Sequence, residues 1–189
     1  MKNYIIIPSA INTVYDNWFS WLKTELENKG FNVCVPYMPQ GEFCNYKNWE
    51  KVLASYKKIG LINKETTIIC YDISCVFATR FIVKTKTNIE GIIGVCPFNT
   101  MVGIEQDKLN KSFVCKNEIL QKVSRFVKFY HTVISNNDPI ISEEDYTKFC
   151  NAVGAKSHTI SGAGHFDSEA GYTKFPELVS LIDNINKII

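Results

Sequence analysis

The sequence predicts an α/β fold of three layers, in which a central, mostly parallel sheet of about six strands lies between two layers of helices. Two observations lead to this prediction. Short apolar runs alternate with longer stretches whose apolar residues recur at helical spacing, which is the pattern of βαβ units. The run Thr67–Cys70 is continuously apolar, as expected of a central strand that is covered on both faces.

The first half of the chain predicts three strands and three helices. An apolar run at Tyr4–Ile7 ends at Pro8 and gives the opening strand. A helix is expected from about residue 16 to residue 28, because tryptophan and leucine recur there at helical spacing and Gly30 follows as a stop signal. The other expected elements are a strand at Phe31–Val35, a helix at Asn45–Ile59, the strand Thr67–Cys70 and a helix that starts almost directly after it.

The second half continues the alternation. Strands are expected at Gly91–Val95, Phe129–Ser135 and Ser157–Ile160, and a less regular region between the first two predicts one helix near Lys116–Val127. A helix is expected at Ser142–Val153, since Ser142 suits an N-cap and Glu144 suits the first turn. Pro176 favours the first turn of a final helix.

Length and composition narrow the class of protein. The 189 residues, of which 46% are hydrophobic and 21% charged, predict one folded domain over residues 1–189 and argue against disorder. The formal charge is +2 and the lysines are scattered, so we expect no nucleic-acid partner. No apolar run reaches the length of a bilayer span and the N-terminus lacks the pattern of a signal peptide, so we expect a cytoplasmic protein with no membrane partner.

The seven cysteines are odd in number and dispersed. They form no C-x-x-C pair and have no histidine at zinc-site spacing, so we expect free thiols that pack as small apolar residues. We accordingly predict no metal site and no cofactor. Oligomeric state is not readable from the sequence.

Polar residues follow three of the predicted strands, at the edge where open parallel sheets place functional groups. Asp72 follows the third strand, Asp138 follows the fifth, and His165 follows the sixth within a loop rich in small residues. A histidine in such a loop is more often functional than part of a core. His131 and His158 fall within predicted strands and are expected to be structural.

The junction at Asp72 is abrupt, because the strand passes into a helix with no glycine or proline between them. A strand that turns directly into a helix holds the residue at the turn in a strained conformation with its side chain exposed, and small residues two before and two after relieve the crowding. Cys70 and Ser74 occupy those two positions here. The segment is therefore a candidate nucleophile elbow with Asp72 at its centre.

The chain order Asp72, Asp138, His165 is that of nucleophile, acid and histidine in the α/β-hydrolase template. Asp138 would accept a hydrogen bond from one ring nitrogen of His165 and leave the other nitrogen facing the nucleophile or a water. Backbone N–H groups of Ile73 and of the loop that contains Ser9 and Ala10 would form the oxyanion hole.

The chain also resembles, nearly end to end, the small lidless serine hydrolases of the retinoblastoma-binding protein nine type. The resemblance rests on Ile7-Pro8, the segment Trp18-Phe-Ser-Trp-Leu-Lys-Thr-Glu25, Met38-Pro39, Thr66-Thr-Ile-Ile69, Ala78-Thr-Arg-Phe81, Asn137-Asp-Pro139 and Gly164-His-Phe166. It implies a lidless α/β-hydrolase fold with a Ser, Asp, His triad, in which Asp138 and His165 match the acid and the histidine. The catalytic serine of the family falls on Asp72, and the glycine-rich oxyanion loop reads Ser9-Ala-Ile-Asn12 here.

Four interpretations of the site follow. Asp72 is a covalent nucleophile for a small ester-like or electrophilic substrate, although Ile73 follows it where aspartate-nucleophile relatives carry tryptophan, and the segment Cys96–Lys128 is too short for a full cap. Alternatively, the chemistry is lost and the fold serves as a binding module for a protein partner. Ser74 is the alternative nucleophile, with Val76 crowding its flank. In the last interpretation, a cation or polar metabolite binds between Asp72 and Asp138.

Overall fold

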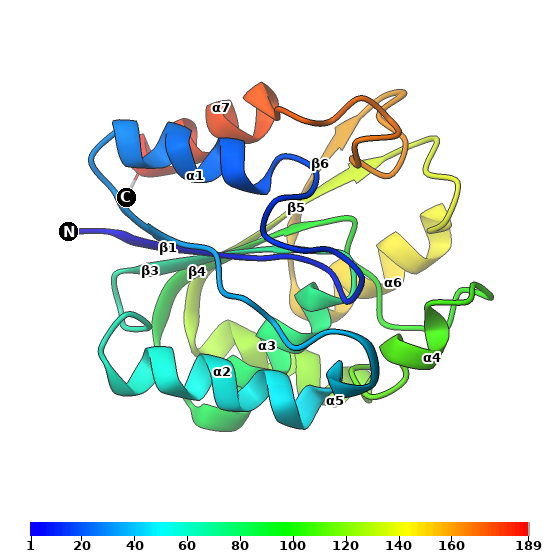
Figure 1. Ribbon diagram of the computed structural model, residues 1–189, viewed down its shortest axis with the longest axis horizontal. Coiled ribbons are helices and arrows are strands. Elements are labelled where there is room, and N and C mark those ends of the chain that lie inside the picture. Colours follow the sequence, from blue (N-terminus) through cyan, green and yellow to red (C-terminus); the bar gives the residue numbers. More distant parts are fainter. Residues whose placement is uncertain (189) are drawn as a thin grey trace.

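A computed structural model describes residues 1–188 and has three layers (Figure 1). The sheet has six strands, all parallel to their neighbours, in the order β2-β1-β3-β4-β5-β6. The strands are β1 Asn3–Ile7, β2 Asn32–Cys34, β3 Thr66–Tyr71, β4 Ile89–Val95, β5 Val127–Ser135 and β6 Lys156–Ile160. The predicted sheet of about six strands is confirmed, with bounds that differ by one or two residues at most ends.

Helices cover both faces of the sheet. The helices α1 and α7 lie on one face, and α2, α3, α5 and α6 lie on the other (Figure 1). Their bounds are α1 Phe19–Asn28, α2 Tyr46–Lys58, α3 Ser74–Thr85, α4 Asp107–Asn110, α5 Asn117–Leu120, α6 Glu143–Val153 and α7 Pro176–Ile188, with 3₁₀ turns at Gly41–Phe43 and Gln121–Arg125. None of the helices formed by residues 1–188 combines the length and apolar character needed to span a bilayer.

Local sequence signals set several helix ends. Ser142 caps α6 by accepting a hydrogen bond from the Asp145 N–H at 3.1 Å, and Asn45 caps α2 in the same way. Gly154 ends α6 in the left-handed conformation, and Pro176 opens α7. These caps confirm the predicted starts of the last two helices.

One predicted helix is present but less regular than expected. The region near Lys116–Val127 forms the short helix α5 followed by a 3₁₀ turn, and β5 begins at Val127, two residues before the predicted start at Phe129. The close approach of β4 and β5 helps to set this register, because a Cβ at Gly91 would lie only 2.3 Å from the Phe129 ring. Glycine therefore leaves room for the Phe129 ring against β4, and a larger residue at position 91 would displace that ring.

The core is one cluster of buried apolar residues that spans both faces of the sheet. Strands β1, β3 and β4 are buried along their whole length, as expected for central parallel strands. On one face Trp18 and Phe19 pack edge-on against Tyr71, and on the other Trp49 packs against Phe77. The chain runs outward from β1 to β2 and then returns to β3 on the other side of β1, so the loops after β1 and β3 diverge and leave room for a site at this switch point.

Candidate active site

The turn between β3 and α3 holds Asp72 in a strained backbone conformation. Its φ of 62° lies in the left-handed region, which residues with a Cβ adopt at a cost. The Asp72 N–H donates to the Val95 carbonyl at 2.8 Å, and the Asp72 carbonyl accepts from the Cys75 N–H at 3.0 Å. These bonds tie the turn to β4 and to the first turn of α3, as the predicted elbow geometry requires.

Ser74, the alternative nucleophile, is fully buried beneath this turn. Its Oγ accepts a hydrogen bond from the Tyr71 N–H at 2.9 Å and lies within donating distance of the Ile7 and Tyr71 carbonyls, at 2.9 and 2.7 Å. Ser74 does not line the cleft that contains Asp72. The structure therefore does not bring Ser74 to a substrate; its hydroxyl stabilises the turn by satisfying backbone groups of β1 and β3.

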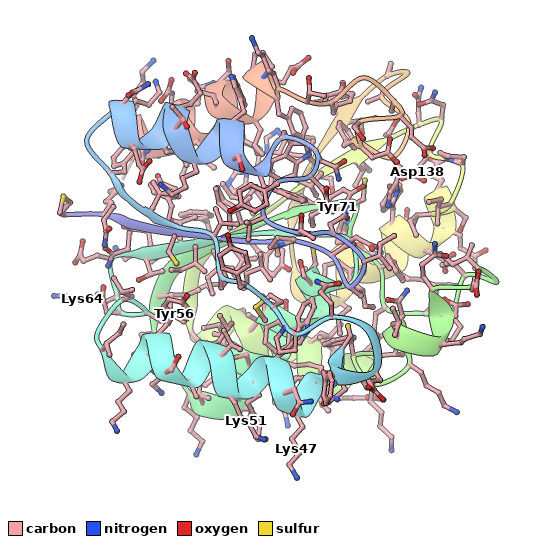
Figure 2. All side chains as sticks on the ribbon, in the orientation of Figure 1. Lys47, Lys51, Tyr56, Lys64, Tyr71 and Asp138 are labelled. Carbon is pink, nitrogen blue, oxygen red and sulfur yellow. The ribbon has the colours of Figure 1, made fainter. Side chains whose placement is uncertain are left out.

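His165 and Asp138 meet at the carboxyl edge of the sheet. His165 Nδ1 lies 2.8 Å from Asp138 Oδ2, with side-chain exposures of 8% and 0%. Tyr71, at the end of β3, holds the loop that carries His165, since its hydroxyl donates to the His165 carbonyl at 2.9 Å. Figure 2 labels Tyr71 near the centre of the molecule and Asp138 beyond the strand ends. With Nδ1 engaged, Nε2 is the ring nitrogen left to act on a substrate or water.

Asp138 is held by more than the histidine. The N–H groups of Ile140 and Ile141 donate to its Oδ1 at 2.8 and 3.0 Å, and the Tyr146 hydroxyl donates to its Oδ2. Burial works against ionisation, but the hydrogen bonds from His165, Tyr146 and the Ile141 N–H outweigh it and lower the pKa of Asp138. Asp138 is therefore a buried carboxylate with a fixed orientation.

Asp72 and His165 line the same small cleft, of about 90 Å³. Burial raises the pKa of Asp72 to about 6, against the opposing attraction of His165 and hydrogen bonding from Ser9 and the Ile73 N–H. Burial by itself would lower the pKa of His165. The hydrogen bond to Asp138 and the negative charges of Asp72 and Asp167 have the larger combined effect, so the pKa of His165 is raised above its ordinary value. The hydrogen bond of His165 goes to Asp138, so Asp72 and His165 act on each other through charge across the cleft.

The predicted oxyanion residues are only partly brought to the cleft. Ser9 lines it, and the Ile73 N–H interacts with the Asp72 carboxylate itself. Ala10 is buried and is not among the residues that line the cleft. A backbone donor is thus present beside the Asp72 carboxylate.

Sequence reasoning missed four residues of the site. Tyr146 reaches Asp138 from α6, and Cys96, at the end of β4, donates from its thiol to the His165 carbonyl at 3.3 Å. Asn17 and Asp167 line the cleft beside His165. Asn17 and Cys96 both have a φ angle of 50°. Asparagine is common in that left-handed conformation, so the asparagine at position 17 could have indicated a turn beside the site.

One group of possible metal ligands exists in the part of the chain that the structure describes. Cys96, Asp138 and His165 offer ligand atoms that lie within 4.8 Å of one another. Asp138 and His165 already satisfy each other, and burial raises the pKa of the Cys96 thiol well above its ordinary value, which disfavours the thiolate that metals bind. The group is accounted for as a hydrogen-bonded network.

Because Asp138 does not line the cleft, the structure also gives no support to a cation between Asp72 and Asp138.

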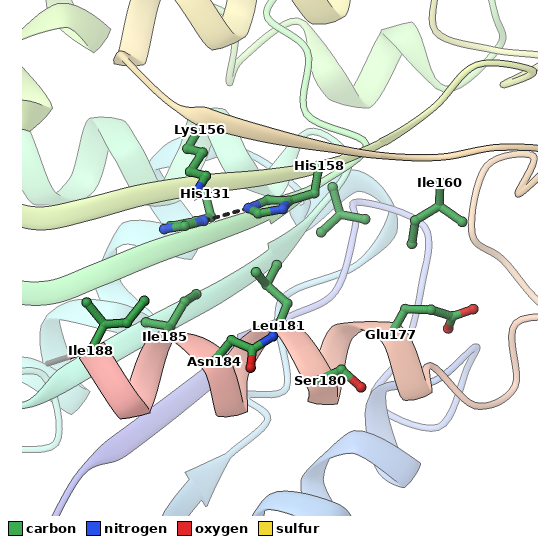
Figure 3. A pocket seen from close by; sticks show the side chains of 11 residues that line it. His131, Lys156, His158, Ile160, Glu177, Ser180, Leu181, Asn184, Ile185 and Ile188 are labelled. Atoms are coloured by element: carbon green, nitrogen blue, oxygen red, sulfur yellow. Dashed lines mark hydrogen bonds between the residues drawn. The ribbon is translucent and has the colours of Figure 1, made fainter.

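A larger groove, of about 440 Å³, lies between α7 and the strands β5 and β6 (Figure 3). His131 Nδ1 and His158 Nε2 are 2.7 Å apart there, in rings that are nearly parallel. Burial, then His158 and Lys156, lower the pKa of His131 to about 4. The two histidines therefore satisfy each other as neutral rings, and the smaller cleft with Asp72 and His165 is the better candidate for chemistry.

The fold and the strand-end site define an α/β-hydrolase-type protein, and the comparisons agree. A profile of the serine hydrolase family matches residues 4–184, so the chain belongs to that family. A comparison with curated protein sequences finds no significant match.

Three solved structures illustrate how far the fold extends. The ydeN gene product of B. subtilis superposes with a TM-score of 0.88 at 21% identity, over 97% of this chain and 98% of that one. A hydrolase from Oleispira antarctica gives 0.69 at 15% identity, over 97% and 92% of the two chains. A meta-cleavage product hydrolase from Pseudomonas fluorescens gives 0.73 at 10% identity, over 100% and 89%. At these identities the similarity establishes the fold alone.

Proposed function

We propose that this protein is a hydrolase that uses Asp72, in the position of the family's serine, as a covalent nucleophile against a small electrophilic substrate. One observation carries the proposal: Asp72 holds the strained turn between β3 and α3 and shares a cleft with His165, whose ring is fixed by Asp138. Maintaining a carboxylate in a left-handed turn is costly, and such cost is typical of functional positions.

In the first step, a carboxylate oxygen of Asp72 attacks a carbon that bears a leaving group. The bond from oxygen to carbon forms as the bond to the leaving group breaks, and the leaving group departs with the electron pair. With a pKa of about 6, Asp72 is mostly ionised at pH 7.5 and is available as the nucleophile. The product of this step is an ester on Asp72.

In the second step, His165 activates water against that ester. The charge of Asp72 contributes to the raised pKa of His165, and esterification removes that charge, so the imidazole releases its proton to solvent more readily and becomes available in its neutral form as the base once the ester exists. Nε2 takes a proton from water, and the resulting hydroxide attacks the ester carbonyl carbon. The alcohol leaves with the proton from His165, and the Asp72 acid loses a proton to regenerate the carboxylate.

The Ile73 N–H supports this second step. It interacts with the Asp72 carboxylate in the resting protein. When hydroxide attacks the ester, negative charge develops on the carbonyl oxygen of that same group, where the donor strengthens its interaction.

Trapping the ester tests the proposal. His165→Gln removes the base, so incubation with a panel of small neutral bromoalkanes is expected to add the mass of one alkyl group to the Asp72 peptide, with loss of bromide. The double variant Asp72→Asn, His165→Gln is the matched control and should stay unmodified. Absence of an Asp72 adduct with every member of the panel would contradict the proposal.

A second candidate function is a non-catalytic binding module. The observation that favours it is the attraction between the charges of Asp72 and His165, which raises the pKa of His165 and so favours the protonated imidazole over the neutral form that a general base needs. Asp72→Ser separates the two candidates, because a strong gain of short-chain ester hydrolysis would reveal that only the nucleophile had been replaced.

We also propose a reducing, cytoplasmic location. All seven cysteines lie within the described residues and are free, and five of them are buried. Free thiols persist in compartments where disulfides are rare.

A further inference from the structure

Asn17 carries an unsatisfied hydrogen-bond donor at the cleft. Its Nδ2 is buried and has no hydrogen-bond partner among residues 1–188, although the residue lines the cleft that holds Asp72 and His165. Its backbone is also in the left-handed region, with φ of 50°. Asparagine tolerates this backbone conformation, but the unpartnered donor costs free energy in the free protein.

The amide cannot simply rotate to find a partner. Asn17 Oδ1 accepts a hydrogen bond from the Ser168 N–H at 3.0 Å, and the neighbouring Trp18 indole donates to the Phe166 carbonyl at 3.0 Å. A flipped amide would set two donors against each other at Ser168, so the orientation is fixed by chemistry. Asn17 is thereby locked to the loop that carries His165.

The charges around Asn17 restrict what the cleft accepts. The charged side chains that line it are Asp72 from the elbow and His165 and Asp167 from the loop after β6. The loop after β1 adds uncharged side chains, and so do Ile104 and Gln106, while Glu105 between them does not line the cleft. Two carboxylates face one imidazole, so an anion entering the cleft is repelled. The remaining lining is made of Ser9, Ile11, Asn12, Tyr71, Ile104, Gln106 and Ile140.

From this arrangement we propose that Asn17 is a specificity-determining residue, which donates a hydrogen bond from Nδ2 to an acceptor atom of a small, uncharged ligand. The acceptor is a carbonyl oxygen or the electronegative atom of a leaving group. This inference rests on the proposed function for its substrate, since the ligand is the electrophile that Asp72 attacks. The volume of about 90 Å³ limits the part of the ligand that enters to a few heavy atoms.

The side-chain amide signals of ¹⁵N-labelled protein provide the test. Acetamide, a neutral acceptor that Asp72 cannot alkylate, is expected to shift the Asn17 amide resonances saturably, whereas acetate at pH 7.5 should bind at least tenfold more weakly. Asn17→Asp retains an acceptor for the Ser168 N–H and lacks the donor, and Asn17→Gly suits the left-handed backbone. In both variants, binding is followed through the backbone amide signals of the cleft residues Asp167 and Asn12, and it is expected to weaken about tenfold.

Asn110 supplies the matched control. It is 1% exposed and its side-chain amide is also unpartnered within the described chain, but it does not line the cleft. Asn110→Leu should therefore leave acetamide binding unchanged. Unaltered Asn17 signals, or equal binding of acetamide and acetate, would overturn the inference.

The outcomes also separate this inference from the covalent mechanism. An Asp72 ester that forms equally well in Asn17→Gly would refute a role for Asn17 and leave the nucleophile in place. Acetamide binding that depends on Asn17, in a protein that forms no ester, would support Asn17 as a ligand donor and count against the covalent step.

Discussion

Replacing Asp72 with asparagine is expected to stabilise the protein near neutral pH. Burial, partly offset by His165, raises the pKa of Asp72 from its ordinary 3.8 to about 6, which corresponds to about 3 kcal/mol of unfavourable free energy when the group is ionised. Asparagine has nearly the same shape and carries no charge, so it avoids this cost. The proposed nucleophile must be ionised, so we expect it to lower the free energy of unfolding in this way.

The pH dependence has a definite sign. The native carboxyl binds its proton more tightly than the unfolded one, so wild-type stability falls as pH rises from about 3.8 through about 6. Below this window the group is protonated in both states, and above it the full penalty applies. The advantage of Asp72→Asn should therefore be absent near pH 3.5 and complete by pH 7.5.

Urea unfolding and thermal unfolding of the two proteins at several pH values measure this difference. At pH 7.5 a gain of about 3 kcal/mol corresponds to a rise in Tm of roughly 6–12 °C for a chain of this size. Glu105→Gln is the control, because that side chain is 84% exposed and its loss should change stability by less than about 0.5 kcal/mol. A gain that does not vary with pH, or no gain at all, would refute the assigned environment of Asp72.

Three further predictions concern neighbouring groups. Asp138→Asn should lower the pKa of His165 in an NMR titration and slow breakdown of the Asp72 ester by roughly 100- to 10,000-fold; an unchanged pKa would contradict the pairing. Ser74→Ala should cost about 1–3 kcal/mol in urea unfolding because backbone groups lose their partner, and full stability would mean that the hydroxyl is not structural. His158→Asn should raise the pKa of His131 above about 4 without reaching 6.5, since burial persists, and a pKa that stays at about 4 would exclude the contribution of His158.

The sheet and the pairing of Asp138 with His165 were predictable from sequence for one physical reason. Parallel strands place their carboxyl ends at one edge, so residues that directly follow β5 and β6 must lie close together. The elbow was predictable because no glycine or proline separates β3 from α3. In each case the order of elements along the chain determines proximity.

The region between β4 and β5 was not predictable in the same way. Its apolar residues lack a clear period, because α4 and α5 are single turns that are too short to show one. The support of Asp138 by Tyr146 was hidden for a related reason. Periodicity predicts α6, but it does not tell which loop the Tyr146 hydroxyl will reach.

The fate of solvent oxygen distinguishes a covalent aspartate from every alternative. After a single turnover of a small alkyl electrophile in H₂¹⁸O, mass spectrometry of the Asp72 peptide should show one ¹⁸O atom in the carboxylate, and the alcohol released should carry ordinary oxygen taken from Asp72. Label in the alcohol, with Asp72 unlabelled, would mean that water attacks the substrate directly and that Asp72 is not the nucleophile.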